Sequence, residues 1–137
     1  MKDLCYNRGA VVLKLRLLPG TFAVCRLEPD AALPAWALAG DLVSITRTPD
    51  ELSIVCPESL VPNGILAEKS WRCIKIRGPL PFSMTGILAS LVNPLAEAGV
   101  SLFAFSTYDT DYVLVKDATL ERARTVLTKA GHSLEEP

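Results

Sequence analysis

The sequence has 137 residues, of which half are hydrophobic and about a fifth are charged, as in a globular protein with a packed core. Fourteen basic and fifteen acidic side chains leave a formal net charge of −1, and no run of Lys or Arg provides the phosphate attraction that dominates nucleic-acid binding. We therefore expect no nucleic-acid partner. The length suits one ordinary domain or two very small ones.

The cysteines lie far apart, without the Cys-x-x-Cys pair that is typical of zinc sites, at Cys5, Cys25, Cys56 and Cys73. Since His132 is the only histidine, we expect neither a metal site nor a cofactor. The apolar run at residues 11–18 is interrupted by Lys14 and Arg16, and no apolar stretch approaches the roughly 20 residues of a membrane span. The sequence predicts a cytoplasmic protein with reduced thiols that does not enter a membrane.

The first half of the chain is predicted to be mostly β. Leu13, Leu15 and Leu17 alternate with charged residues, which is the pattern of a strand with one buried face. Further strands are expected at residues 21–27, 42–48 and 52–56, with a short helical turn around Trp36.

Proline, asparagine and glycine at residues 57–70 predict a surface connection between two halves. We place the boundary there, which gives one module at residues 1–66 and a second at residues 67–137.

The second half follows the order β-α-β-β-α-β, in which two helices cover one face of a four-stranded antiparallel sheet. The strands are expected at residues 71–77, 100–107, 112–115 and 133–134. The first half has strands in a similar order and a degraded helical part. We therefore predict an α+β fold with two ferredoxin-like modules (βαββαβ) in tandem.

The first helix of the second half is expected to follow Ser83, a good N-cap residue, because Ile87, Leu91 and Leu95 recur at helical spacing. Pro94 lies within this stretch and removes one intrahelical hydrogen bond, so we expect a bend or a local break.

The second helix is expected to begin after Thr119. Gly99 and Gly131 follow the two predicted helices and suit their C-terminal caps. His132 follows the second of these glycines and is expected on the surface.

A polar turn at residues 106–111 separates two strands and is the candidate binding site. Asp111 could accept the ammonium group of an amino acid while Thr107 and Thr110 donate to its carboxylate. The alternative is ordinary turn chemistry, in which these side chains bond the local backbone. An enzyme would need either the pair Asp109 and Asp111 or the thiol of Cys73 to take part in catalysis. Since no nucleophile–base pair or metal ligand is evident near them, we expect no catalytic residue.

Three blocks resemble the tandem ACT-domain proteins of the CASTOR-like family: residues 44–55, residues 78–88, and residues 94–102 running into 106–112. ACT domains typically bind amino acids or similar metabolites at interfaces between modules and regulate another activity. The resemblance therefore implies a sensor and not an enzyme.

The family's ligand-binding elements correspond to a strand start, a loop before a helix and the polar turn. By this resemblance the ligand-binding residues are Ser101 and Leu102, then Leu80 and Met84, then Thr107, Tyr108, Thr110 and Asp111. The family's sensors have four ACT units and this chain has two, so the resemblance implies a homodimer. Met84 stands where the arginine sensors have a glutamate, which suits a smaller or more apolar amino acid.

A second hypothesis follows from the predicted architecture. Two helices on one face of a sheet leave its other face and its edge strands available for pairing. The chain would then be a non-catalytic adaptor that binds another protein, with a vestigial ligand site.

Overall fold

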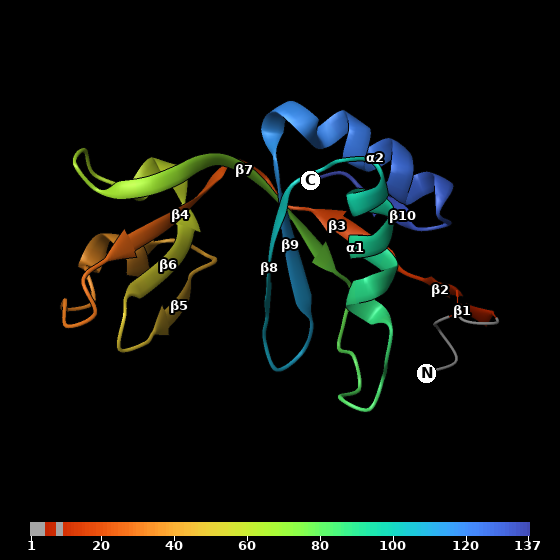
Figure 1. Ribbon diagram of the computed structural model, residues 1–137, viewed down its shortest axis with the longest axis horizontal. Coiled ribbons are helices and arrows are strands. Elements are labelled where there is room, and N and C mark those ends of the chain that lie inside the picture. Colours follow the sequence, from red (N-terminus) through yellow and green to blue (C-terminus); the bar gives the residue numbers. More distant parts are fainter. Residues whose placement is uncertain (1–4, 8–9) are drawn as a thin grey trace. The chain divides into compact units, whose positions relative to one another are not determined.

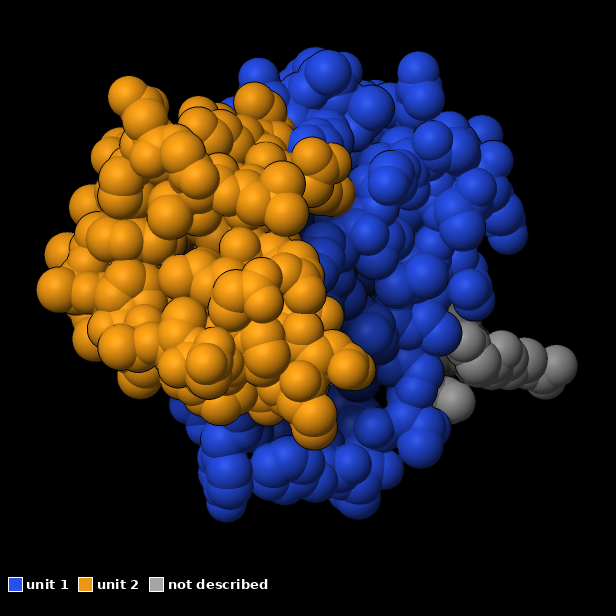
Figure 2. Space-filling view, turned by 60° about the vertical axis from the view of Figure 1, so that its left-hand side comes forward, with its two compact units in different colours: residues 1–19, 72–137 blue, residues 20–71 orange. Residues whose placement is uncertain are grey.

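The computed structural model describes residues 5–7 and 10–137 (Figure 1). The chain forms two compact units, coloured separately in Figure 2. Unit 1 comprises Met1–Pro19 and Arg72–Pro137, and unit 2 comprises Gly20–Trp71. This division differs from the expected one at residues 66 and 67, because a strand near the N-terminus pairs with strands of the second half.

Unit 1 contains two helices, the end of the long strand β7 and most of the other strands. Its elements are β1 (Cys5–Asn7), β2 (Ala10–Val12), β3 (Lys14–Leu17), the end of β7 (Leu66–Ile76), α1 (Ile87–Glu97), β8 (Leu102–Ser106), β9 (Asp111–Lys116), the 3₁₀ turn η3 (Asp117–Thr119), α2 (Leu120–Lys129) and β10 (Ser133–Glu135). The strand order of the sheet is β10-β3-β7-β9-β8, while β1 pairs with β2.

The second half was expected to form a four-stranded antiparallel sheet, and this expectation was wrong in one respect. Strand β3 lies between β10 and β7, parallel to β10 and antiparallel to β7. The other four strands keep the predicted βαββαβ order. The N-terminal strand is inserted because its alternating leucines supply a buried row that matches Ile74 and Ile76 on β7.

The core of unit 1 lies between one face of this sheet and the two helices (Figure 1). Leu13, Leu15 and Leu17 pack with α1 residues such as Leu91 and α2 residues such as Leu127, and all five are almost fully buried. Alternation along β3 places Lys14 and Arg16 on the opposite, helix-free face.

Helix α1 begins at Ile87, not after Ser83. A turn precedes it, in which the Met84 N–H donates to the Pro81 carbonyl at 3.1 Å. The N-cap is Gly86 with φ 76°, a left-handed conformation that glycine adopts without strain. Gly99, also left-handed, follows the helix end as expected.

Unit 2 repeats the strand order of unit 1 with 3₁₀ turns in place of the helices. Its elements are β4 (Phe22–Leu27), η1 (Ala35–Ala39), β5 (Ser44–Arg47), β6 (Leu52–Pro57), η2 (Glu58–Leu60) and the first part of β7. The sheet order β7-β4-β6-β5 matches β10-β7-β9-β8 in unit 1 once β3 is set aside. The predicted ferredoxin-like duplication with a degraded helical part in the first module is thus confirmed.

Strand β7 starts at Leu66, within the stretch expected to be a connection. A bulge interrupts its pairing with β4, since Phe22 faces Trp71 whereas Val24 faces Glu68. Ser70 in this bulge has φ 66°, and its N–H donates to the Glu58 carboxylate at 2.7 Å. Because the residues around the bulge are polar, the sequence there lacks the alternation of apolar and polar residues that is typical of a strand.

Candidate functional site

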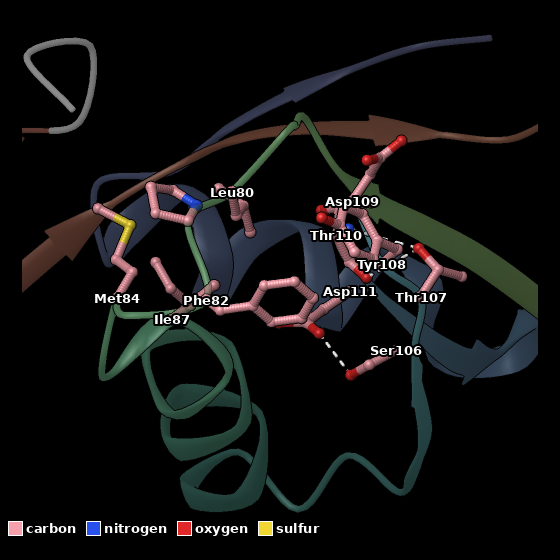
Figure 3. Close-up of a pocket in the computed structure, with 11 residues that line it drawn as sticks. Leu80, Phe82, Met84, Ile87, Ser106, Thr107, Tyr108, Asp109, Thr110 and Asp111 are labelled. Atoms are coloured by element: carbon pink, nitrogen blue, oxygen red, sulfur yellow. Dashed lines mark hydrogen bonds between the residues drawn. The ribbon is translucent and has the colours of Figure 1, made fainter.

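A cavity of about 220 Å³ in unit 1 lies between the loop that precedes α1 and the β8–β9 turn (Figure 3). Its lining combines apolar residues of the loop and of α1 with polar residues of the turn. The lining residues are Leu80, Pro81, Phe82, Met84, Ile87, Ser106, Thr107, Tyr108, Asp109, Thr110 and Asp111. We call it the Asp111 pocket. It contains six of the eight residues expected at the binding site.

The loop and the turn are joined by direct backbone contacts. The Leu80 N–H donates to the Asp109 carbonyl at 2.7 Å. A Cβ atom on Gly78 would lie only 3.0 Å from the same carbonyl oxygen and 3.1 Å from Thr110 Cβ, so only glycine fits here without a shift. These contacts therefore fix the position of the loop relative to the turn.

The side chains of Thr107 and Thr110 form hydrogen bonds that stabilise the turn. The Thr107 N–H donates to the Thr110 carbonyl at 2.8 Å, and the Thr107 hydroxyl contacts the Thr110 carbonyl and N–H at 3.2 and 3.4 Å. The Thr110 hydroxyl donates to the Ile76 carbonyl at 2.7 Å, and Thr110 is only 4% exposed. Turn chemistry thus accounts for both hydroxyls, and Thr110 connects the turn to β7.

Asp111 provides the carboxylate at the start of β9. It is half-buried and accepts a hydrogen bond from the Ser106 hydroxyl, which comes from the paired end of β8 (Figure 3). Sequence reasoning did not name Ser106 as a binding residue, although it opens the polar turn and pairs with Asp111 across the hairpin.

Two aromatic rings stand at the rim of the pocket. Phe82 and Tyr108 meet edge to face, with ring centroids 4.9 Å apart and an interplanar angle of 86°. Their exposed fractions are 75% and 81%, which is unusual for large side chains of this kind. Tyr108 was expected at the site by name, whereas Phe82 was expected there only as part of the loop from Leu80 to Met84.

Ser101 and Leu102 do not line the pocket. They lie at the start of β8, and the pocket lies at its end near Ser106. A strand of this length separates the two by roughly 13 Å at about 3.3 Å per residue. Within one chain, the strand start and the polar turn are therefore not brought together.

The Asp111 pocket has a distinct electrostatic character. Among the eleven described residues that line it, none is cationic, and Asp109 and Asp111 carry the formal charge. Leu80, Met84 and Ile87 form the apolar wall. This arrangement fits a small ligand that has both an ammonium group and an apolar part.

No group of three or more His, Cys, Asp or Glu side chains that could hold a metal ion occurs in the part of the chain that the structure describes. Cys73 is fully buried on β7, and burial raises the pKa of its thiol to about 12. A thiol in that state is a poor nucleophile. Across residues 5–7 and 10–137, no helix combines the length and apolar composition of a membrane span.

Comparison with protein families gives two adjoining matches. The ACT domain model matches residues 66–129, and a model described as an N-terminal domain matches residues 20–64. The cytosolic arginine sensor for mTORC1 subunit 1 of Bos taurus is 33% identical over 88 residues, which is 56% of this chain and 27% of the bovine protein. The human protein CASTOR3P is 31% identical over 85 residues, with 53% and 52% of the two chains covered. The match thus spans about a quarter to a half of these curated relatives.

Solved structures extend the similarity to nearly the whole chain. A crystal structure of a protein from Agobacterium tumefaciens is 43% identical with a TM-score of 0.87, covering 92% of this chain and 94% of that one. The regulatory subunit of aspartate kinase from Thermus flavus is 14% identical with a TM-score of 0.60, covering 87% and 97%. The second likeness shows the fold alone.

The fold and the comparisons together define an α+β protein with the ferredoxin-like ACT architecture. Residues 66–129 form an ACT domain, and the chain is similar to the CASTOR-like ACT-domain proteins.

Proposed function

We propose that this protein is a regulatory sensor that binds an amino acid or a related metabolite in the Asp111 pocket, at an interface between ACT modules. The observation that carries the proposal is the pairing of a carboxylate, Asp111, with an apolar wall in one small cavity. The ACT match and the arginine-sensing name of the bovine relative support an amino-acid ligand.

The chemistry of the pocket selects among amino acids. Asp111, oriented by Ser106, would accept the ammonium group, and Leu80 and Met84 would contact the side chain. A cavity of about 220 Å³ is smaller than the roughly 300–1,000 Å³ of pockets for drug-sized ligands. A small or medium apolar amino acid fits better than arginine, because Met84 offers no charge to a cationic side chain.

Binding of the ligand's carboxylate would require donors from a second copy of the chain. Among the described residues that line the Asp111 pocket there is no cation to bind it. The strand start at Ser101 and Leu102 would supply backbone donors if it came from the partner in a homodimer. Binding would favour the closed arrangement of the two copies and so shift the population recognised by a regulated protein partner.

We assign no reaction to the protein, since Cys73 is buried as a neutral thiol and Asp109 lies exposed in a turn. The cytosolic relatives support a cytoplasmic location.

The test is a thermal unfolding panel of the amino acids on the full chain. A ligand that binds only the folded protein stabilises it by about 2.7 kcal/mol at a hundred times its Kd, so one apolar amino acid should raise Tm. Asp111→Asn keeps an acceptor for Ser106 but loses the charge, and should remove most of the shift. Glu97→Gln removes an exposed carboxylate at the end of α1 that does not line the pocket, so it is the matched control and should keep the shift. Equal shifts in both variants would refute the placement of the site.

The adaptor hypothesis remains as an alternative because β8 is an edge strand of unit 1. Its residues Phe103 and Phe105 are half-buried, and in the sheet order of the described residues it pairs with β9 alone. If no amino acid shifts Tm while Phe105→Lys abolishes association with another chain, the adaptor is favoured.

A further inference from the structure

A second cavity in unit 1 has the opposite charge. It measures about 230 Å³ and is lined by Leu15, Arg16, Lys75, Arg77, Gly78 and Glu135. Three of these residues are cationic and one is anionic, although the whole chain carries a net charge of −1. We call it the Arg16 cavity. Positive charge is thus concentrated locally and does not reflect the composition of the protein.

The strand register explains how the cations meet. Arg16 on β3 lies directly opposite Lys75 on β7, since the two strands are antiparallel. The Arg77 N–H donates to the Lys14 carbonyl at 2.9 Å, which places a second pair of cationic residues opposite each other on the same face. Two like-charged pairs therefore stand side by side on the helix-free face of the sheet.

Like charges directly opposite each other destabilise a sheet. Glu135 compensates in part, because it pairs with Arg16 in the parallel β10–β3 register and lies 3.8 Å from Arg77. Lys75 Nζ lies 5.9 Å from the centre of the Tyr112 ring. This cation–π contact stabilises the Lys75 ammonium group but adds no negative charge to the cavity. The cavity keeps an excess of two positive charges, which an anion would neutralise.

We propose that the Arg16 cavity binds a phosphate dianion, either inorganic phosphate or the phosphate group of a metabolite. Arg16 and Arg77 carry planar guanidinium groups whose N–H donors match phosphate oxygens, and Lys75 adds a third positive charge to the lining. A dianion matches the charge excess, whereas a single carboxylate would leave half of it. This site is separate from the Asp111 pocket and does not depend on the proposed function.

The experiment follows backbone amide chemical shifts of the full chain by NMR during titration at constant ionic strength. Two probes are used, inorganic phosphate and glycerol phosphate, with chloride as the reference anion. We expect shifts at Arg16, Lys75, Gly78 and Glu135 with both probes. Tighter binding of glycerol phosphate would identify a metabolite as the source, and equal binding would identify free phosphate.

Variants separate the site from general electrostatic attraction. Arg16→Gln combined with Arg77→Gln should weaken phosphate binding at least about tenfold, as expected for the loss of charge-assisted hydrogen bonds. Arg122→Gln removes an exposed cation on α2 and is the matched control that should bind normally. Asp111→Asn should also bind phosphate normally.

Folding provides an independent readout. Lys75→Gln relieves the repulsion with Arg16, so without phosphate its Tm should equal or exceed that of the wild type, while its response to phosphate falls. The proposal is overturned if neither probe shifts the amides of the cavity, or if the double variant binds phosphate as tightly as the Arg122→Gln control.

Discussion

The carbonyl oxygen of Ser90 lies 2.9 Å from Nε2 of His132, at the one place in α1 where a proline removes the backbone donor. Residue 94 would normally donate to the Ser90 carbonyl, but Pro94 has no N–H. His132 takes over that role from the segment after α2. Its Nδ1 accepts the Leu13 N–H at 3.0 Å, which assigns the neutral tautomer with the proton on Nε2.

The expectation that His132 lies on the surface was wrong, since it is only 3% exposed. We predict that His132→Phe lowers the free energy of unfolding by about 2–4 kcal/mol, because two backbone groups lose their partner and each buried unsatisfied group costs about 1–3 kcal/mol. Urea unfolding measures this change. A loss below about 0.5 kcal/mol would mean that the two hydrogen bonds contribute little.

A double-mutant cycle tests the link to the proline. Pro94→Ala restores an N–H that can donate to the Ser90 carbonyl within α1. The His132→Phe substitution should therefore cost about 1 kcal/mol less in the Pro94→Ala background than in the wild type. Equal costs in the two backgrounds would show that His132 does not substitute for the missing donor.

The bulge in β7 stores backbone strain that can be removed. Ser70 is exposed and has φ 66°, a conformation that costs a residue with a Cβ atom about 1–2 kcal/mol. We expect Ser70→Gly to raise the free energy of unfolding by about 0.5–1 kcal/mol, after the entropy lost by glycine is deducted. Ser70→Ala keeps the strain and is the control that should resemble the wild type. Urea midpoints distinguish the two.

Thr110 is predicted to stabilise the pocket and not to contact the ligand. Thr110→Val leaves the Ile76 carbonyl without the hydroxyl donor and should cost about 1–2 kcal/mol of stability. Thr110→Ser retains the hydroxyl and should lose much less. Amino-acid binding should be retained in Thr110→Ser, and an unchanged stability of Thr110→Val would show that this hydrogen bond is unimportant.

Most of the secondary structure was predictable from the sequence because its periodicity is strong. The alternating leucines of β3 and the helical spacing of Ile87, Leu91 and Leu95 each mark a buried face. The pairing of β3 with β10 could not be predicted, since a strand pattern shows which face is buried but does not identify the neighbouring strand. The start of α1 was missed because Ser83 resembles an N-cap, whereas Gly86 provides it.

The candidate site was predictable to the extent that it is local. The turn residues Thr107 to Asp111 adjoin one another in sequence, and the family resemblance added the loop with Leu80 and Met84. Arg16 and Lys75 are 59 positions apart, and only the register of β3 with β7 brings them together. No pattern in the sequence therefore predicted the Arg16 cavity.

The buried thiols predict how stability depends on pH. Burial raises the pKa of Cys73 from 9.0 to about 12 and does the same for Cys56. The folded state thus retains protons that the unfolded chain releases above about pH 9. The stabilisation by these neutral thiols is complete below that pH and is lost as the pH rises toward 12.

Cys73→Ala isolates one thiol in this pH dependence. The free energy of unfolding of the wild type should fall between pH 9 and 12, with a limiting slope of about 1.4 kcal/mol per pH unit for each thiol that remains protonated only in the folded state. The variant loses stability at every pH because a small cavity forms, but its slope should be shallower by up to that amount. In a Cys5→Ser background, iodoacetamide at about pH 8 should label Cys73 only after unfolding. Rapid labelling of the folded protein, or identical slopes, would show that the thiol ionises in the native state.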